Sequence, residues 1–291
     1  MIVIHDAPRC TFDVAAELRA AGRRDARLIQ TLMTTAQVLV EVADDLATVT
    51  LNRPERRNAL SESMLRDLGE ALTRAAGAPG VRAIILAAVG PVFSAGHDFA
   101  DMVDRDLDAM RRLLRVCTDV MLGIAQLPVP VVAQIQGVAT AAGCQLVASC
   151  DLAVAVHDAT FATPGGRGGW FCHTPLVAIA RVVGPRRALE LGMTGDPIDA
   201  PTALAWGLVN RVVPRADLAT TTAALARAAS RGSLASKALG KRTLHHQVGL
   251  PVEAAYAEAV EVMAHSAITP DGREAMRSFC EKRPAHYPPR P

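Results

Sequence analysis

The first clear pattern of apolar and polar positions along the chain is an alternation. VLVEV at 38–42 and LATVTL at 46–51 stand on either side of a turn at 43–45. A period of two is typical of half-buried strands, so these segments predict a β-hairpin. Short apolar runs predict further strands, most of them buried, at 83–88, 129–135, 152–156, 161–162 and 209–213.

Segments whose apolar residues recur at helical spacing lie between these strands. Ser61 is a candidate N-cap for a helix over 62–76, and residues 104–127 keep apolar positions on one face of a long helix. Small residues lead into a helix around 145–150, and Thr174-Pro175 opens a helix that Gly184 closes. The chain is then mostly helical, so strand–strand–helix units followed by a helical tail predict an α/β fold.

Composition and charge exclude several classes of protein. A net charge of +2 argues against nucleic-acid binding, and no apolar run reaches the length of a membrane span. The six cysteines form no CxxC pair and no zinc spacing, so we expect no metal site and a reducing, cytoplasmic location. Rossmann, P-loop and GxSxG motifs are absent from the sequence.

Two loops carry candidate chemistry. Phe93 to Asp98 follows a buried strand, and its Gly96 permits positive φ or the close approach of a ligand. Residues 136–146 lead from a strand into a helix through small residues, whose first amides lack intrahelical partners. Two such amides from two loops form an oxyanion hole, whereas an ordinary turn and close helix packing are the structural alternatives.

Six collinear stretches carry a family resemblance over roughly residues 38–285. They are NRPERRNAL, FSAGHDFADM, PVPVVAQIQGVATAAGCQLVASCDLAVA, FATPG, VVGPRRALELGMTGDPIDAPTALAWGLVNRVVP and FCEKRPAHYP. The chain resembles the crotonase (enoyl-CoA hydratase/isomerase) superfamily, in particular the enoyl-CoA hydratase domain-containing branch. The resemblance implies a crotonase (ClpP-like) spiral of ββα units with a helical C-terminal region that builds trimers or hexamers. We therefore expect an extension at 1–32, poorly ordered or peripheral, a spiral core at 33–230 and a helical region at 231–291.

The resemblance also implies site residues. It places oxyanion-hole amides at His97 and Ala142, and thus chemistry through an acyl-CoA enolate, with coenzyme A as part of the substrate and no separate cofactor. Asp151 matches a family aspartate that we expect to be structural. The positions assigned to substrate binding are Arg56, Arg57, Asn58, Ala59, Ala95, Gly96, Asp98, Met102, Gly143, Pro164, Gly165, Trp170, Phe279 and Lys282.

The chain departs from the hydratase pattern at both catalytic carboxylates. Gln145 and Gly165 occupy the positions where typical hydratases carry glutamates, and neither residue can act as a carboxylate base. His173 stands at a helix start where some relatives hold a catalytic carboxylate, so it is a candidate base or a loop histidine with a local hydrogen bond. The His97 side chain is a weaker candidate, because only its amide is needed.

Three functions remain open from the sequence. The first is an enzyme that acts on acyl-CoA thioesters as a hydratase or isomerase. The second is an acyl-CoA-binding protein with little turnover, which the loss of both glutamates favours. The third is a self-compartmentalising serine protease of the related spiral fold, for which no suitable serine, histidine and aspartate can be identified.

Overall fold

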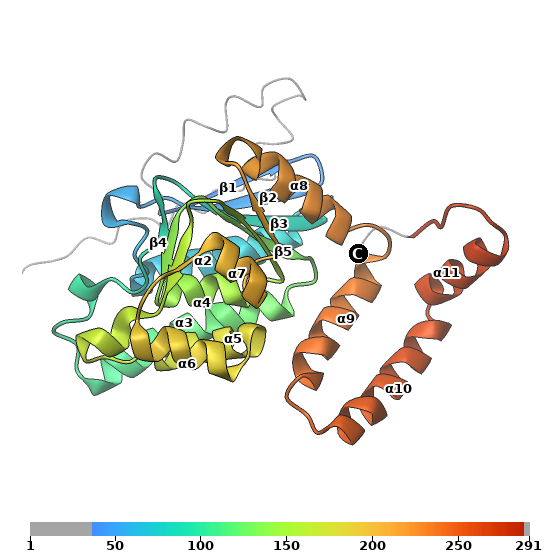
Figure 1. The fold of residues 1–291 in the computed structure, drawn as a ribbon. Coiled ribbons are helices and arrows are strands. Elements are labelled where there is room, and N and C mark those ends of the chain that lie inside the picture. The colour runs from blue at the N-terminus through green and yellow to red at the C-terminus, as the bar shows by residue number, and fades with distance from the viewer. Residues whose placement is uncertain (1–36, 288–291) are drawn as a thin grey trace, which may run out of the picture. The chain divides into compact units, whose positions relative to one another are not determined.

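The strands of the chain form two sheets in the computed structural model, which describes residues 37–287 (Figure 1). The larger sheet has six strands in the order β1-β2-β3-β5-β7-β10, and the smaller has four in the order β4-β6-β8-β9. The strands are β1 (Val38–Ala43), β2 (Leu46–Leu51), β3 (Ala83–Ala88), β4 (Val92–Ser94), β5 (Val131–Ile135), β6 (Val138–Thr140), β7 (Leu152–Val156), β8 (Thr160–Ala162), β9 (Ile198–Asp199) and β10 (Arg211–Val213).

Ten α-helices accompany these strands in the described residues. They are α2 (Glu62–Gly77), α3 (Leu107–Gln126), α4 (Ala142–Ser149), α5 (His173–Val183), α6 (Pro185–Thr194), α7 (Ala200–Trp206), α8 (Leu218–Ala229), α9 (Leu234–Gln247), α10 (Val252–Ile268) and α11 (Pro270–Cys280). None of the described helices is both long and apolar enough to cross a membrane.

The chain alternates between the two sheets. β3, β5 and β7 enter the larger sheet as parallel neighbours, and the strand that follows each of them, β4, β6 or β8, enters the smaller sheet. Helix α3 then leads to β5 and β6, α4 leads to β7 and β8, and α5 follows β8. This repeated path is the spiral of ββα units that the sequence predicts, so the expected α/β fold class is confirmed.

Most of the expected elements form at the expected places. β1 and β2 pair as an antiparallel hairpin, and the Ser61 side chain accepts a hydrogen bond from the N–H of Met64 at 3.2 Å to cap α2. The long helix begins three residues later than expected, because Asp106 caps it through the N–H of Ala109 at 2.7 Å. Sequence analysis missed the short strands β4, β6 and β9, and it took β4 for part of a loop.

A half-buried ion pair connects the C-terminal helix α9 to the larger sheet. Nζ of Lys241 on α9 lies 2.7 Å from Oδ2 of Asp151, which also accepts a hydrogen bond from the N–H of Val131 at 2.7 Å. Removing either charge would leave the other poorly solvated. Asp151 thus has the structural contacts that the resemblance led us to expect.

The described residues form one unit that begins at Gln37. The extension expected at 1–32 lies outside the described residues. In the chain that follows, α8 ends at Ala229 and α9 begins at Leu234, so the expected boundary at 230/231 falls between two helices. The division of residues 33–291 into a core and a C-terminal region stays a prediction.

Candidate functional site

Three loops meet at one edge of the smaller sheet. β4, β6 and β8 are parallel neighbours, so their carboxyl ends point to the same edge. The loop after β4 carries residues 95–98, the loop after β6 leads directly into α4, and the loop after β8 forms the 3-10 helix η4 (Pro164–Gly168). The carboxyl edge of parallel strands is the usual place for a ligand site in α/β proteins.

A parallel β-bridge to Leu60 sets the backbone direction of the first loop. The N–H of Leu60 donates to the carbonyl of Gly96 at 2.7 Å, and the N–H of Asp98 donates to the carbonyl of Leu60 at 3.3 Å. Because these bonds use the residues on either side of His97, the N–H of His97 points away from Leu60. Within residues 37–287 this N–H donates no hydrogen bond.

The second loop turns sharply at Ala141, whose φ of 50° and ψ of −118° favour glycine. The turn is held because the N–H of Ala141 donates to the carbonyl of Ala162 at 2.9 Å, and the N–H of Gln145 donates to the carbonyl of Ala141 at 3.0 Å. Ala142 is therefore the first residue of α4, and its N–H has no hydrogen-bond acceptor in the described chain.

Two glycines allow the first two loops to approach closely. A Cβ atom on Gly96 would lie 3.2 Å from the backbone nitrogen of Ala142 and 2.9 Å from the Cβ of Ala141. A Cβ on Gly143 would overlap the carbonyl oxygen of Ser94. The loop that carries the His97 amide and the helix start that carries the Ala142 amide are thus in contact.

The third loop covers the first one with an aromatic side chain. The Trp170 ring lies 6.4 Å from the His97 ring and 6.2 Å from the Phe99 ring, measured between centroids. The N–H of Trp170 donates to the carbonyl of Gly165 at 2.9 Å, which folds the loop back on itself. A Cβ on Gly165 would overlap the Trp170 carbonyl oxygen, so a glutamate at this position does not fit the present loop.

Each loop contributes a buried polar atom that has no hydrogen-bond partner among the described residues. These atoms are His97 Nε2, Gln145 Oε1 and Thr163 Oγ1. Buried polar atoms in native proteins are nearly always paired, so an unpaired one beside these loops suits a polar ligand or a bound water molecule. Thr163 was not among the residues expected from the sequence, although it stands in the FATPG stretch.

The loop at 56–59, which the resemblance assigns to substrate binding, leads through Leu60 to the site, but several of its side chains stabilise the fold. The buried Asn58 side chain donates to the carbonyls of Val89 and Val92 and accepts from the N–H of Arg53. Arg56 forms an ion pair with Asp98 at 3.1 Å.

The remaining predicted residues of this region differ in accessibility. Arg57 is exposed, and its guanidinium makes no hydrogen bond or ion pair within residues 37–287. Ala59 and Met102 are buried, and Ala95 is half-buried, with its N–H donating to the carbonyl of Arg57 at 3.0 Å. Of this loop, therefore, the Arg57 side chain is free to meet an anionic ligand.

The candidate base at His173 is exposed at the first residue of α5. Its ring lies 5.1 Å from the ring of Phe171, and its N–H donates to the Phe171 carbonyl at 2.8 Å. Burial raises the pKa of the neighbouring Cys172 thiol and raises the pKa of Cys144 to about 12. These thiols are protonated at neutral pH, so neither is an activated nucleophile.

The two C-terminal residues of the predicted site lie apart from the three loops in the contacts of this chain. Phe279 is 85% exposed on α11, which packs against α9 and α10, and Lys282 follows that helix. No hydrogen bond or ion pair joins either residue to the three loops within residues 37–287. No group of three or more His, Cys, Asp or Glu side chains in that part of the chain could hold a metal ion.

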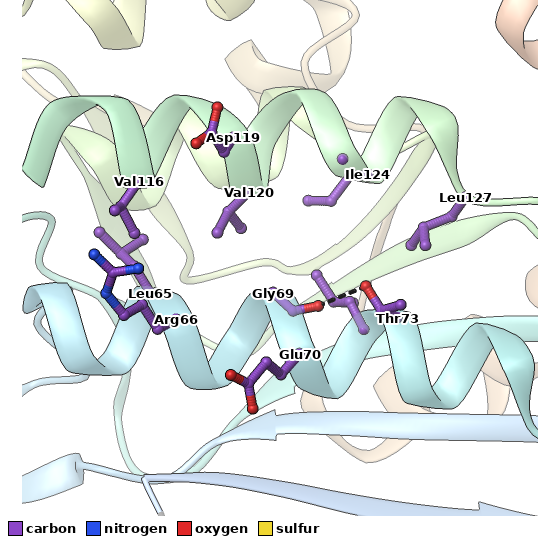
Figure 2. A pocket seen from close by; sticks show the side chains of 12 residues that line it. Leu65, Arg66, Gly69, Glu70, Thr73, Val116, Asp119, Val120, Ile124 and Leu127 are labelled. Atoms are coloured by element: carbon purple, nitrogen blue, oxygen red, sulfur yellow. Dashed lines mark hydrogen bonds between the residues drawn. The ribbon is translucent and has the colours of Figure 1, made fainter. Parts of the chain in front are cut away.

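A separate hollow of about 340 Å³ lies between α2 and α3 (Figure 2). Its floor is mostly apolar, and the hydroxyl of Thr73 on its wall donates to the Gly69 carbonyl at 2.9 Å. It contains none of the predicted site residues, and the one arginine at its rim, Arg66, already pairs with Glu62 at 2.7 Å.

Comparison with known proteins gives consistent matches. The sequence profile of the family described as enoyl-CoA hydratase/isomerase matches residues 41–290. The chain is 44% identical over 246 residues to enoyl-CoA hydratase domain-containing protein 3, mitochondrial, of Danio rerio. These residues make up 84% of this chain and 85% of the relative. The human protein of the same name is 40% identical over 264 residues, covering 90% of this chain and 85% of the relative.

Solved structures agree with this match. A crystal structure described as enoyl-CoA hydratase of Mycobacterium smegmatis is 43% identical, has a TM-score of 0.82, and covers 87% of this chain and 99% of its own. The crystal structure of human enoyl coenzyme A hydratase domain-containing protein 3 is 39% identical with the same TM-score, and it covers 87% of this chain and 100% of its own.

These relatives correct one expectation and decide the family. The vertebrate proteins are named as mitochondrial, which contradicts the cytoplasmic location expected from the sequence. Free cysteines argue against an oxidising compartment, but they do not distinguish one reducing compartment from another. With a profile over residues 41–290 and relatives of this similarity, the chain belongs to the enoyl-CoA hydratase/isomerase family of the crotonase superfamily.

Proposed function

We propose that the chain is an enzyme that binds acyl-CoA thioesters and stabilises their enolate between the N–H groups of His97 and Ala142. The observation that carries the proposal is that neither N–H donates a hydrogen bond within residues 37–287, although their loops are in contact. Two donors without acceptors at one place can bind one carbonyl oxygen. That oxygen gains negative charge when a proton leaves the carbon beside it, so the donors act most strongly on the enolate.

The position of Ala142 adds an electrostatic contribution. It is the first residue of α4, where the unpaired N–H groups and the helix dipole favour negative charge. Ala142 is buried and its side chain is small, and Gly96, which has no Cβ, lies beside its main-chain nitrogen. The backbone conformation of Ala141 is strained, and proteins keep such a conformation only where the surrounding contacts stabilise it.

The side chains around the proposed hole favour proton transfer without a pair of carboxylates. Gln145 and Gly165 stand at the carboxylate positions of typical hydratases, and the carboxylate of the first loop, Asp98, is paired with Arg56. The reaction is therefore a double-bond shift or a hydration that uses a different base. His173 stays a candidate for that base, and Trp170 stays a candidate for the wall beside the acyl chain.

Coenzyme A would be held from the side of the 56–59 loop. Arg57 is exposed and free of ion pairs with the described residues, so its guanidinium can form a two-point contact with a phosphate. Arg56 is held by Asp98 and contributes by fixing the loop. No separate cofactor enters the scheme, because the substrate itself carries the coenzyme.

Acyl-CoA binding and turnover test the proposal directly. We expect calorimetric titration to show binding of a short acyl-CoA, and we expect a conjugated or unconjugated enoyl-CoA to change its thioester absorbance on incubation with the protein. Free coenzyme A, which lacks the thioester carbonyl, serves as the ligand control and should bind more weakly. A protein that binds none of these thioesters would contradict the proposal.

The second candidate function is acyl-CoA binding with little turnover. The observation that favours it is the pair Gln145 and Gly165, since an amide and a hydrogen atom cannot take a proton from water at neutral pH. An acyl-CoA-binding protein and an enzyme would differ in whether the bound thioester is converted. Tight binding of every enoyl-CoA offered, with no change in absorbance and no exchange of the α-protons, would support this function instead.

Self-association completes the proposal. Helix α10 has no buried residue, although it presents large apolar side chains to solvent: Val252, Tyr256, Val260 and Met263. An exposed apolar helix of this kind is best explained by contact with another protein surface. We propose that a second and a third copy of the chain cover it, in the trimer that the family resemblance implies, alone or paired as a hexamer. In that assembly Phe279 and Lys282 are candidates for contact with a neighbouring subunit's coenzyme A.

A further inference from the structure

The imidazole of His97 has a hydrogen-bond arrangement that fixes the position of its proton. Its Nδ1 lies 3.3 Å from the carbonyl oxygen of Leu60. A carbonyl oxygen only accepts hydrogen bonds, so Nδ1 must carry the hydrogen for this contact to be attractive. In the neutral ring, the other nitrogen, Nε2, then carries a lone pair.

Burial keeps that ring neutral. Desolvation lowers the pKa of His97 from the model-compound value of 6.5, and the Leu60 carbonyl and the Asp101 carboxylate oppose this shift less strongly. The Asp101 charge is compensated, because Arg105 lies 3.1 Å from it. The ring contact at 6.4 Å comes from the uncharged Trp170. At neutral pH the residue is therefore an uncharged imidazole with a free electron pair on Nε2.

Nε2 is also one of three buried polar atoms without hydrogen-bond partners that belong to the three loops and the first turn of α4, among the described residues. The other two, Gln145 Oε1 and Thr163 Oγ1, cannot take up a proton at neutral pH, because amide oxygens and hydroxyls are too weakly basic. Among the three, only the imidazole nitrogen can accept a proton. It belongs to the same residue whose N–H is proposed to hold the enolate oxygen.

We propose that Nε2 of His97 is the catalytic proton acceptor, so that His97 contributes its main chain to the oxyanion hole and its side chain as the base. This inference rests on the proposed function. It suits a double-bond shift in a β,γ-unsaturated acyl thioester, because a single base can remove one proton and return it elsewhere. It replaces the exposed His173 as the base, since His173 has no partner that fixes its tautomer in the described chain.

The step balances without any further reactant. The lone pair of Nε2 forms a bond to the α-proton, the electrons of the C–H bond form a double bond to the thioester carbon, and the carbonyl electron pair moves onto oxygen. The imidazolium then gives its proton to the γ-carbon, where the electrons of the β,γ double bond form the new C–H bond. The oxygen electron pair re-forms the carbonyl, and the electrons of the enolate carbon–carbon double bond shift to form the α,β double bond of the conjugated product.

Side-chain substitutions at position 97 separate the two roles, because every residue except proline keeps the main-chain N–H. His97→Asn places an amide nitrogen near the position of Nδ1, where it can still donate to Leu60, but it has no atom at the position of Nε2. We expect a fall in kcat for 3-enoyl-CoA isomerisation of roughly 10²- to 10⁴-fold, which is the usual contribution of a general base. Binding of a saturated acyl-CoA should stay within about threefold, since the proposed oxyanion donors are intact.

His157→Asn is the matched control and should keep kcat within about threefold, because His157 is exposed in the turn after β7 and no proposed step uses it. If the wild-type protein isomerises and His97→Asn does so at the same rate, the base assignment is wrong while the proposed function stands. If the wild-type protein binds no acyl-CoA, the proposed function itself fails. Binding without isomerisation or α-proton exchange in the wild-type protein also overturns the base assignment.

Nitrogen NMR of the wild-type protein gives a second test that does not depend on a folded variant. The shifts of the two ring nitrogens at pH 7 should identify a neutral His97 with hydrogen on Nδ1. Assignment of the resonance is checked by its loss in His97→Asn. A ring with hydrogen on Nε2, or a charged ring at pH 7, would overturn the proposal, because no lone pair would then be available at Nε2.

Discussion

Replacing Gly96 with alanine tests whether two amides share one small space. The added Cβ would lie 3.2 Å from the nitrogen of Ala142, 2.9 Å from the Cβ of Ala141 and 3.0 Å from the carbonyl oxygen of Thr140. The first loop and the start of α4 must then move apart by some tenths of an ångström. None of the three contacts is with the end of a flexible side chain, so the strain cannot be relieved by a rotamer change.

The size of the effect follows from two separate costs. Gly96 has a φ of +86°, and an alanine there loses about 1–2 kcal/mol from backbone strain. Crowding of a packed region adds roughly 1–3 kcal/mol to the loss in free energy of unfolding. Displacement of one oxyanion donor lowers kcat by about 10²- to 10³-fold.

Gly80→Ala provides the matched control. Gly80 has nearly the same φ, +80°, but a Cβ there meets no atom within 4 Å. Both variants should lose stability from the positive φ in urea denaturation, whereas only Gly96→Ala should lose turnover of an enoyl-CoA. Wild-type kcat in Gly96→Ala, at protein concentrations where it is folded, would refute the convergence of the two amides.

Four further predictions address other features of the chain. Ala141→Gly should raise the free energy of unfolding by about 1 kcal/mol in urea denaturation, because relief of strain at a φ of 50° exceeds the added flexibility of the unfolded chain; a less stable variant would show that the turn is unstrained. Since burial lowers the pKa of His97 below 6.5, the unfolded chain binds a proton that the folded chain refuses, so stability should fall as pH drops through 6.5 and level off below the lowered folded pKa. His97→Asn should lack this component in denaturation series between pH 7 and 5, and an unchanged pH profile would count against a buried neutral ring. Val260→Asp on α10 should shift sedimentation towards the monomer, whereas Glu253→Asp on the same helix should not; equal behaviour of the two would mean that α10 does not mediate assembly. Gln145→Glu adds a carboxylate with little change in volume and should raise 2-enoyl-CoA hydration by roughly 10²-fold in an absorbance assay, and no gain would mean that this position no longer faces the reacting carbons.

The sequence predicted the positions of helices and strands well wherever a local sequence signal existed. Alternation located the hairpin β1–β2, and Ser61 marked the start of α2 through its side chain. The small residues before Cys144 indicated a helix start, although α4 begins at Ala142, three residues earlier than expected. The resemblance then brought the loops of His97 and Ala142 together as partners, which neither local pattern could do.

The sequence could not predict features that depend on distant pairing or on side-chain direction. β4 and β6 are three residues each, too short for a period to show, and they are strands because they pair with one another and β6 with β8. Asn58 was predicted to bind substrate from the family resemblance, and only coordinates show its side-chain amide bonded to the carbonyls of Val89 and Val92. Thr163 was overlooked because a buried hydroxyl without a partner has no sequence signature.

The alternation of strands between two sheets has a consequence for how such a chain diversifies. The units that begin with β3, β5 and β7 place their second strand in the smaller sheet, so the turns after β4, β6 and β8 occupy equivalent positions in successive units. Two of these positions offer peptide groups, which no substitution other than proline deletes. Mutations at Gln145 or in the glycine-rich turn can therefore change the side chains around the site, while the two main-chain N–H groups proposed to bind the thioester oxygen are kept.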